Sequence, residues 1–359
     1  MNILIFGATG SIGIQSINVV RKLGHKIVGC SFHSNISQMQ KIIKSLKYDI
    51  DVFSSKVTAL NTVKTIDQLF EKTKPDLVIN AISGFAGLEI TLKTILNKID
   101  LALANKESYV LAGWKIKEIA KAQGVNIFPI DSEHCAIYDL MKNKRINKLL
   151  LTASGGPFYN KEIHELNNVS FYEAKNHPNW KMGYKISIDS ATLMNKCFEM
   201  IEAYYMFNIK NIEAIYHPQS IVHSMIEFSD NSVHAQMSIA DMKLAIELAI
   251  SKFKSKVPII EKLSFEKLNL SFDYIDENKW LPIKWAKYII KNDDRVLPVI
   301  INAANDAAIE LFKNKKIKFN QIIPIISLAI NDFSNQKINN IKDIFILNSI
   351  IKQYILSKF

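Results

Sequence analysis

The chain has 359 residues, of which 48% are hydrophobic and 22% are charged. This length exceeds what one core usually holds and predicts two or three domains, and the composition excludes an intrinsically disordered protein. Lysine and arginine outnumber aspartate and glutamate by 45 to 34, but the basic residues are scattered, so the formal charge of +11 does not predict a nucleic-acid-binding protein.

The cysteines and the N-terminus predict where the protein works. Cys30, Cys135 and Cys197 form no CxxC pair and are odd in number, which favours a reducing compartment. Met1 leads directly into a predicted strand, without the pattern of a secretory or transit peptide. No apolar run reaches the roughly 18 residues that a membrane-spanning helix needs. We therefore expect a cytoplasmic protein with no membrane partner.

Short apolar runs alternate with helical patterns in the N-terminal third of the chain. The runs fall at residues 2–6, 26–32, 76–81, 101–104 and 125–130. A helical pattern follows the first run and extends to about Leu23. This alternation predicts an α/β fold with a parallel, doubly wound sheet.

The texture changes from about Asp131, where polar loops containing glycine and proline separate the periodic segments. Such loops usually carry function. A lysine-rich stretch at 251–267 indicates a connection, and beyond about Pro282 the apolar residues have helical spacing. We expect domains at residues 1–130, 131–255 and 285–359, with a linker at 256–284.

A glycine-rich turn joins the first predicted strand to the first helix. Its sequence, Gly7-Ala8-Thr9-Gly10-Ser11-Ile12-Gly13, has the spacing GxxGxxG in place of the commoner GxGxxG. Glycines let the backbone approach a pyrophosphate, and amides at the helix N-terminus stabilise its charge, so the turn predicts dinucleotide binding. The second strand ends in Ser31-Phe32-His33-Ser34-Asn35, without the acidic residue that would bind the ribose of NAD, which favours NADP.

Two carboxylates follow the strand predicted at 125–130. Asp131 and Glu133, within Asp131-Ser132-Glu133-His134, face the same way if strand geometry continues through them. They would then place two hard oxygen ligands together for Mg²⁺ or Mn²⁺. A solvated acidic turn is the alternative that this segment alone leaves open.

Residues 189–199 predict the start of a helix with Asp189 or Ser190 as its N-cap. On that helix Asn195 and Lys196 lie four and three residues before Glu199, so the three side chains share one face. An amide, an ammonium and a carboxylate beside a helix N-terminus suit a phosphate at one end and a metal at the other. An ordinary ion pair between Lys196 and Glu199 is the alternative.

Two further loops have compositions typical of ligand-binding segments. Ala153-Ser154-Gly155-Gly156-Pro157 offers a hydroxyl and bare backbone amides, which form either an anion-binding nest or a plain turn. His177-Pro178-Asn179-Trp180-Lys181-Met182-Gly183 places a large aromatic residue in a polar loop. Its tryptophan either closes over a ligand as part of a lid or anchors the loop to the core.

These segments together resemble the 1-deoxy-D-xylulose 5-phosphate reductoisomerase family. Seven of them appear in the family's order: GATGSIG at 7–13, LANKES at 103–108, DSEH at 131–134, LTASGGPF at 151–158, NHPNWKMGYKISIDSATLMNK at 176–196, HPQSIVHSMIEF at 217–228 and INAAND at 301–306. The resemblance implies an N-terminal Rossmann-like NADPH-binding domain, an α/β catalytic domain with a mobile flap, a C-terminal helical bundle, and a homodimer.

The resemblance also implies a role for each matching position. The cofactor positions are Thr9, Gly10, Ser11, Ile12, Asn35, Asn105, Glu107 and Gly183. The metal, Mg²⁺ or Mn²⁺, would be bound by Asp131, Glu133 and Glu199. The substrate positions are Lys106, Ser132, Glu133, Ser154, His177, Trp180, Ser190, Asn195, Lys196 and Glu199, of which Ser154, Ser190, Asn195 and Lys196 lie toward the phosphate. The catalytic set comprises Lys106, Asp131, Glu133, His177 and Glu199.

The implied activity is the NADPH-dependent rearrangement and reduction of 1-deoxy-D-xylulose 5-phosphate, a small phosphorylated sugar, to 2-C-methyl-D-erythritol 4-phosphate in isoprenoid precursor synthesis. The chain departs from the family's usual residues at Ala8, His33, Ser34, Cys135, Cys197, Ser238 and Ala240. No departure removes an implied metal ligand.

Two other classes of protein fit parts of the sequence. A metal-independent dehydrogenase of an amino-acid semialdehyde would explain the glycine-rich turn, and a basic NADP-binding regulator that contacts nucleic acid would explain the charge. Neither explains why Asp131, Glu133 and Glu199 all stand at positions that resemble metal ligands.

Overall fold

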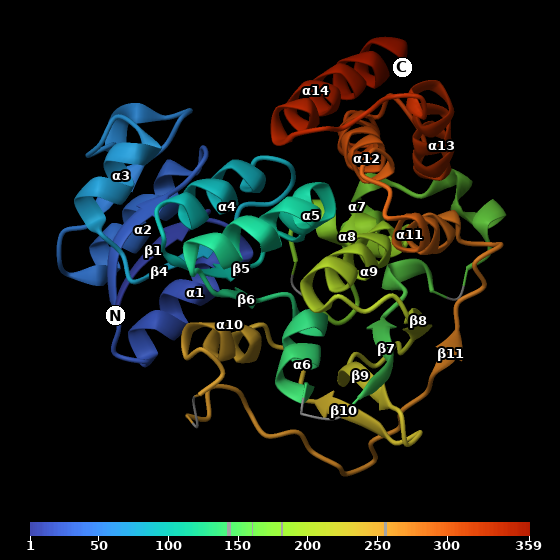
Figure 1. Ribbon diagram of the computed structural model, residues 1–359, viewed down its shortest axis with the longest axis horizontal. Coiled ribbons are helices and arrows are strands. Elements are labelled where there is room, and N and C mark those ends of the chain that lie inside the picture. The colour runs from blue at the N-terminus through green and yellow to red at the C-terminus, as the bar shows by residue number, and fades with distance from the viewer. Residues whose placement is uncertain (142–144, 160, 181, 255–256) are drawn as a thin grey trace. The chain divides into compact units, whose positions relative to one another are not determined.

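The computed structural model describes residues 1–141, 145–159, 161–180, 182–254 and 257–359. Its contacts divide the chain into two compact units, each built around one sheet (Figure 1). The first unit comprises Met1–Asn105, Lys115–Asp139 and Asp241–Lys262. The second comprises Lys106–Trp114, Leu140–Ala240 and Leu263–Phe359.

The sheet of the first unit has six parallel strands in the order β3-β2-β1-β4-β5-β6. The strands are β1 (Asn2–Phe6), β2 (Lys26–Ser31), β3 (Asp51–Phe53), β4 (Leu77–Asn80), β5 (Asp100–Leu103) and β6 (Ile127–Pro129). The helices are α1 (Ser11–Lys22), α2 (Ile36–Leu46), α3 (Ile66–Thr73), α4 (Gly87–Leu96), part of α5 (Lys106–Gln123), most of α6 (Ser132–Leu140), and α10 (Lys243–Ile250). The predicted doubly wound parallel sheet is confirmed, and its strand order is that of dinucleotide-binding proteins.

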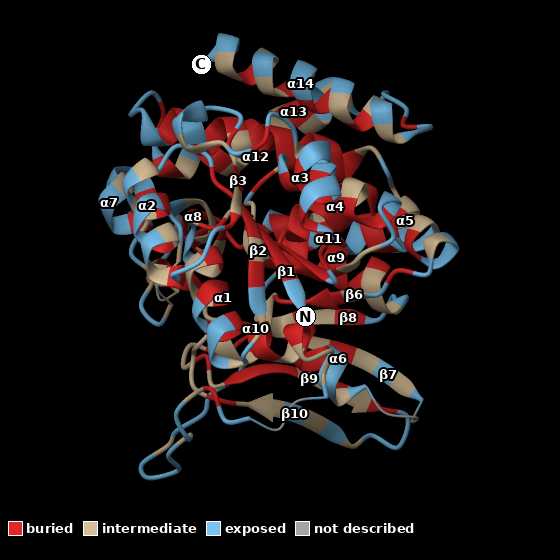
Figure 2. Ribbon diagram, turned by 90° about the vertical axis from the view of Figure 1, so that its left-hand side faces the viewer, coloured by how far each residue is buried: buried red, intermediate tan, exposed pale blue. Residues whose placement is uncertain are grey.

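Both faces of this sheet are buried, which explains why its strands are continuous apolar runs. Ile3 and Ile5 belong to a core with residues of α1, α2 and α10. Phe6 belongs to the opposite face, because successive side chains of a strand alternate, and its ring lies 5.6 Å from that of Phe70 in α3. Figure 2 shows β1 as buried beyond its first residue and β2 as mostly buried.

The sheet of the second unit is mixed, with the order β10-β9-β7-β8-β11. Its strands are β7 (Ile146–Ala153), β8 (Ile212–Tyr216), β9 (Val222–Phe228), β10 (Val233–Met237) and β11 (Asp273–Tyr274). Strands β7 and β8 are parallel, and the other pairs are antiparallel. The helices α7 (Phe171–Ala174), α8 (Tyr184–Ala191) and α9 (Met194–Phe207) follow β7, and α9 packs against β7 and β8.

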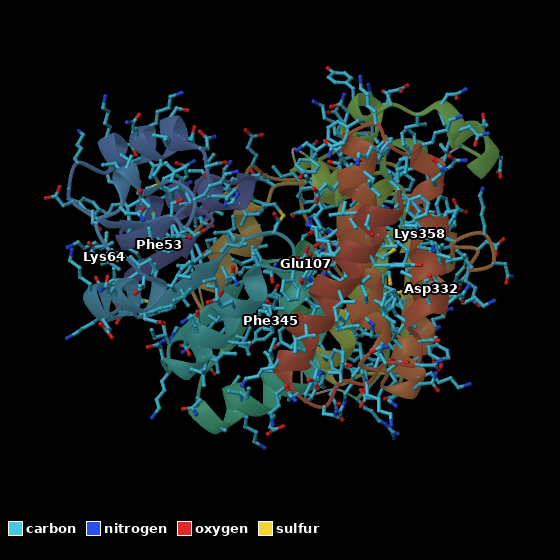
Figure 3. The ribbon with its side chains drawn as sticks, turned by 90° about the horizontal axis from the view of Figure 1, so that it is seen from above. Phe53, Lys64, Glu107, Asp332, Phe345 and Lys358 are labelled. Atoms are coloured by element: carbon cyan, nitrogen blue, oxygen red, sulfur yellow. The ribbon has the colours of Figure 1, made fainter. Side chains whose placement is uncertain are left out.

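The C-terminal part of the second unit is helical, as the sequence predicted. It comprises α11 (Leu281–Asn292), α12 (Leu297–Lys313), α13 (Ile322–Phe333) and α14 (Ile341–Lys358). The mostly buried α12 packs against α13 and α14 (Figure 2). At the ends of α13 and α14, Asp332 accepts a 2.6 Å hydrogen bond from Tyr354 and lies 3.6 Å from Lys358 (Figure 3).

Short 3₁₀ helices complete the two units, at Thr58–Leu60, Gly156–Phe158, Ile163–Asn168 and Phe319–Gln321. Within the described ranges, every helix is too short or too polar to cross a bilayer. Cys30, Cys135 and Cys197 are buried free thiols. Burial raises the pKa of Cys30 to about 12, and it also raises the pKa of Cys135 and of Cys197.

Candidate active site

In the turn between β1 and α1, two glycines are required by the fold and a third is less crowded. Gly7 has a φ of +79°, and a Cβ on it would lie 2.7 Å from the carbonyl oxygen of Ala81. A Cβ on Gly13 would lie 2.2 Å from the carbonyl oxygen of Gly7. At Gly10, which is exposed and precedes α1, the nearest atom would be 3.3 Å away. An open backbone at a helix N-terminus that lacks a side-chain cap fits a pyrophosphate group.

The remaining cofactor positions of the first unit lie around this turn and after β2 and β5. Thr9 and Ile12 are half-buried and Ser11 is exposed. The exposed Asn35 caps α2 by accepting a 3.1 Å hydrogen bond from the backbone amide of Gln38. Asn105 is buried, and its side-chain amide donates to the carbonyl oxygens of Ile82 and Gly84, both at 2.9 Å. Asn105 therefore shapes the loop that follows β4.

The acidic segment after β6 differs from its predicted geometry. Helix α6 begins at Ser132, and the carbonyl of Asp131 accepts the first helical hydrogen bond from Cys135 at 2.8 Å. The prediction that strand geometry continues through Asp131 and Glu133 is therefore wrong, because the chain turns into a helix between them. Both carboxylates lie at a helix N-terminus, where the backbone amides favour negative charge.

Neighbouring polar groups hold both of these carboxylates. Ser132 donates a 2.5 Å hydrogen bond to Oε2 of Glu133. The fully buried His134 has its Nδ1 atom 3.3 Å from Oδ1 of Asp131. Side-chain orientation at a hard-cation site commonly depends on such partners.

In the second unit a buried carboxylate is shared by two lysines. Oε1 of Glu199 lies 2.9 Å from Nζ of Lys106, and Oε2 contacts Nζ of Lys196. Asn195 accepts from Lys106 at 2.7 Å and donates to Glu199 at 2.5 Å. Lys196 also donates to the carbonyl oxygen of Thr152 at 2.5 Å. Four of the predicted residues are thus brought together, with two ammonium groups against one carboxylate.

The predicted N-cap at Asp189 or Ser190 is wrong. Both residues lie in the last turn of α8, and α9 begins separately at Met194. The break lies at Leu193, whose φ of 59° is left-handed and cannot continue a helix. The Thr192 hydroxyl accepts from the amide of Met194 at 3.4 Å. The helix N-terminus in this segment is therefore that of α9, next to Asn195.

The turn after β7 packs against the end of α8 through a bare glycine. Gly156 has a φ of +66°, and a Cβ on it would lie 2.9 Å from the backbone nitrogen of Ala191. Its amide donates to the hydroxyl oxygen of Ser154 at 3.2 Å. This close approach places the turn that carries Ser154 beside the segment that carries Ser190, as expected for two ligands of one phosphate.

The segment predicted as a flap is fixed to the rest of the second unit by side-chain contacts. Nε2 of His177 lies 2.8 Å from the hydroxyl oxygen of Ser154. Asn179 donates to the carbonyl oxygen of Pro218 at 2.5 Å. The half-buried ring of Trp180 has its centroid 5.9 Å from that of His223. Lys181 of this segment lies outside the described residues.

The last two cofactor positions belong to the second unit. Gly183 is exposed at the N-cap of α8, and a Cβ on it would meet no atom within 4 Å. Glu107, labelled in Figure 3, is buried in the first turn of α5. Its Oε1 atom is 3.6 Å from Nζ of Lys185. Sequence reasoning gave Lys185 no role. The four-residue spacing to Asp189 was the available signal, since such pairs meet on a helix.

Comparisons with known proteins identify the family of the chain. The family model of 1-deoxy-D-xylulose 5-phosphate reductoisomerase matches residues 3–113. The model of its C-terminal domain matches residues 127–207, and a model described as the DXP reductoisomerase C-terminal domain matches residues 237–354.

Relatives and solved structures match the chain over nearly its whole length. The 1-deoxy-D-xylulose 5-phosphate reductoisomerase of Malacoplasma penetrans is 50% identical over 98% of this chain and 94% of the relative, and that of Mycoplasmoides gallisepticum is 39% identical over 100% and 99%. A crystal structure of DOX-P reductoisomerase in complex with NADPH, fosmidomycin and magnesium has a TM-score of 0.93 at 32% identity, covering 100% of this chain and 98% of that one. The Zymomonas mobilis enzyme in complex with NADPH has a TM-score of 0.87 at 30% identity, covering 99% and 98%. The chain therefore belongs to the 1-deoxy-D-xylulose 5-phosphate reductoisomerase family.

Proposed function

We propose that the chain catalyses the NADPH- and divalent-metal-dependent conversion of 1-deoxy-D-xylulose 5-phosphate to 2-C-methyl-D-erythritol 4-phosphate. The observation that carries the proposal is the buried group of Lys106, Asn195, Lys196 and Glu199, in a chain of this family. Two ammonium groups and one carboxylate leave a formal charge of +1. A net positive, buried group suits an anionic substrate, because opposite charges attract strongly away from water.

The residues of the glycine-rich turn fit NADPH. Thr9, Gly10, Ser11 and Ile12 would hold the pyrophosphate, since Gly10 is open and stands at the N-terminus of α1. The further positions are Asn35, Asn105, Glu107 and Gly183. When bound, NADPH supplies the hydride for reduction of an aldehyde.

Three carboxylates fit a divalent metal, either Mg²⁺ or Mn²⁺. Asp131, Glu133 and Glu199 would supply the oxygen ligands that these hard cations prefer. The metal, when bound, supplies Lewis-acid stabilisation of charge on the ketone and hydroxyl oxygens of the substrate.

The remaining residues bind and shield the substrate. Ser154, Ser190, Asn195 and Lys196 would bind the phosphate, which is remote from the reacting carbons and supplies binding energy for their orientation. Lys106, Ser132 and His177 would contact the sugar. The flap that carries Trp180 would exclude water from the aldehyde.

We also propose a domain assignment, an assembly and a compartment. Residues 1–130 would bind NADPH, residues 131–255 would carry the metal and substrate positions, and residues 285–359 would form the helical domain after a linker at 256–284. The homodimer is proposed from the family resemblance. The cytoplasm is proposed because Cys30, Cys135 and Cys197 are all free thiols.

The test is a steady-state assay of NADPH oxidation with 1-deoxy-D-xylulose 5-phosphate, with and without Mg²⁺ or Mn²⁺, and identification of the product by mass spectrometry. We expect turnover that a chelator abolishes and added metal restores. Glu199→Gln should lower kcat by about a hundredfold or more, because one metal ligand loses its charge. Glu310→Gln, which changes a carboxylate that is 47% exposed on α12, is the matched control.

One outcome would contradict the proposed activity, and a second would contradict only the proposed metal-ligand set. Turnover of an amino-acid semialdehyde that persists in excess chelator would identify a metal-independent dehydrogenase. Wild-type kcat in Glu199→Gln would remove that residue from the ligand set while leaving the activity itself established.

A further inference from the structure

An ammonium group surrounded by three carboxylates lies in the second unit. Nζ of Lys185 is 2.7 Å from Oδ2 of Asp189, 3.3 Å from Oδ1 of Asp306 and 3.6 Å from Oε1 of Glu107. The most exposed of these four side chains, that of Asp306, is only 17% exposed. Asn305 adds a 2.7 Å hydrogen bond from its side-chain amide to Oδ1 of Asp189. Both oxygens of Asp189 are therefore held.

The charges of this cluster are unequal, which distinguishes it from a simple ion pair. Burial by itself lowers the pKa of Lys185, but Asp189, Asp306 and Glu107 outweigh burial and raise that pKa above its ordinary value, so the lysine stays charged. Burial raises the pKa of Asp306, attraction to Lys185 opposes this, and repulsion by Glu107 and Asp189 adds to it. Three carboxylates around one lysine cost more electrostatic energy than a single pair would.

Each partner of Lys185 lies in a different segment of the chain. Glu107 is next to Lys106, which binds Asn195 and Glu199. Asp189 is next to Ser190 in the last turn of α8. Asp306 belongs to α12, in the INAAND segment that the resemblance left without a role. One ammonium group thus joins the start of α5, the end of α8 and the C-terminal helical region.

We propose that Lys185, Asn305 and Asp306 are positioning residues, which fix Lys106 and Ser190 in the geometry that binds the phosphorylated substrate. This inference rests on the proposed function. None of the three needs to touch the substrate, because Lys185 and Asn305 act through Asp189 and Glu107, whose chain neighbours are the predicted substrate ligands. Helix α12 of the C-terminal helical region thereby contributes to substrate affinity.

The test uses Asp306→Asn, which keeps the size of the side chain and removes one of the crowded charges. We expect the KM for 1-deoxy-D-xylulose 5-phosphate to rise about three- to tenfold, because the link between α12 and α8 is weakened. The melting temperature should stay equal or rise, because repulsion among the carboxylates is relieved. Asp306→Glu should restore KM, and Lys185→Met should raise KM by about tenfold or more.

The matched control is Lys352→Met, which removes a lysine 3.2 Å from Glu310 of the same helix α12, in a pair that is 41% and 47% exposed. Wild-type KM in both folded Asp306→Asn and folded Lys185→Met overturns the inference. It is also overturned if Lys352→Met raises KM equally, or if KM rises only together with a lower melting temperature. If Lys185→Met does not fold, Asp306→Asn decides.

Amide hydrogen exchange separates this inference from the proposed function. In Asp306→Asn without any ligand, the amides of residues 188–192 should exchange faster than in the wild type, because the ion pair that links Lys185 of α8 to α12 is lost. If the wild type does not convert 1-deoxy-D-xylulose 5-phosphate, the proposed function fails and the exchange result still tests the link. Unchanged exchange at residues 188–192 overturns it.

Discussion

His177 presents its Nε2–H group to the hydroxyl oxygen of Ser154, 2.8 Å away. The tautomer follows from Nδ1, which accepts hydrogen bonds from the backbone amides of Asn179 at 3.2 Å and Trp180 at 3.1 Å. The amide of Gly156 also donates to the Ser154 oxygen, at 3.2 Å. Because that oxygen accepts two hydrogen bonds, the hydroxyl hydrogen of Ser154 points away from His177 and Gly156 and can be donated to a ligand.

Ser154→Ala should lower kcat/KM for the phosphorylated substrate by about tenfold or more, because a hydroxyl-to-phosphate hydrogen bond belongs to the strong, charge-assisted class. Steady-state kinetics measure the change, and the exposed Ser55→Ala is the control. An unchanged kcat/KM would show that Ser154 donates elsewhere.

Lys196 is buried, and its ammonium group donates hydrogen bonds to Glu199 and to the Thr152 carbonyl oxygen. If it also binds the phosphate, Lys196→Ala should lower kcat/KM by about ten- to a hundredfold. The dephosphorylated substrate analogue, assayed at saturating metal, should remove most of the difference between wild type and variant. An equal penalty on both substrates would show that Lys196 serves only as the partner of Glu199.

Two glycines of the β1–α1 turn should respond differently to a side chain. Gly10→Val should fold and weaken NADPH binding by about tenfold or more, because its branched side chain takes the space that the pyrophosphate needs, while its Cβ, 3.3 Å from the Gly7 carbonyl oxygen, requires only a small backbone adjustment. Gly13→Ala should instead lower the free energy of unfolding by about 1–3 kcal/mol, since its Cβ would overlap the Gly7 carbonyl. NADPH titration and urea unfolding of both variants separate the effects, and a destabilised Gly10→Val would contradict the distinction.

How much of this structure the sequence predicts depends on how local the signal is. The β1–α1 turn was predictable because the hydrophobic period changes at glycines whose φ angles and close approaches no other residue allows. The C-terminal helices were predictable from their apolar spacing alone. The break at Leu193 was not, because a leucine with positive φ carries no local signal and packing imposes it.

Contacts between distant residues escaped prediction for a different reason. Asn305 meets Asp189 across 116 positions, and neither residue has a pattern that specifies the other. The helical start of α6 at Ser132 also differs from the expectation, although Asp131 is a common type of helix cap, because the apolar run before it indicates a strand and no local signal marks where that strand ends. Tertiary packing determines both these long-range contacts and the residue at which the helix begins.

Ser238 holds the ring of His223 in this chain. The Ser238 hydroxyl donates to the carbonyl of Ile239 at 3.0 Å, so Nε2 of His223 must donate to the Ser238 oxygen, 2.7 Å away. The same ring lies beside Trp180 of the flap. Ser238→Gly should lower the free energy of unfolding by about 1 kcal/mol and kcat/KM by about two- to fivefold, because the surface that receives Trp180 loosens.

Ser238→Thr keeps the hydroxyl and is the matched control, measured by the same unfolding and kinetic experiments. Equal kcat/KM in Ser238→Gly and wild type would show that the hydroxyl does not influence the flap.

His217 should make stability depend on pH. Its Nε2 accepts from the amides of Ile221 at 3.1 Å and Val222 at 3.0 Å, and its Nδ1 donates to the Ser271 carbonyl at 3.0 Å. Burial lowers the pKa of His217 below its ordinary value of 6.5, although the Ser271 carbonyl acts in the opposite direction. As the pH falls, His217 therefore takes up a proton at a higher pH in the unfolded chain than in the folded protein.

The contribution of His217 to the free energy of unfolding is complete above about pH 6.5. It is lost as the pH falls from there to the folded-state pKa, and the free energy changes by at most about 1.4 kcal/mol per pH unit. Urea unfolding of wild type and His217→Gln across this range measures it as the difference between the two curves. A difference that grows as the pH falls would reverse the sign and refute the assignment.

Chemical labelling of the three cysteines can measure how often the folded protein opens. A thiol reacts with an alkylating reagent as the thiolate, and burial keeps Cys30, Cys135 and Cys197 both protonated and out of reach. Cys30 lies in the core of the first unit and Cys197 in α9 of the second. The labelling rate at each position therefore follows the opening of the unit around it, and mass spectrometry of the two peptides distinguishes a chain that unfolds as a whole from one whose units open separately.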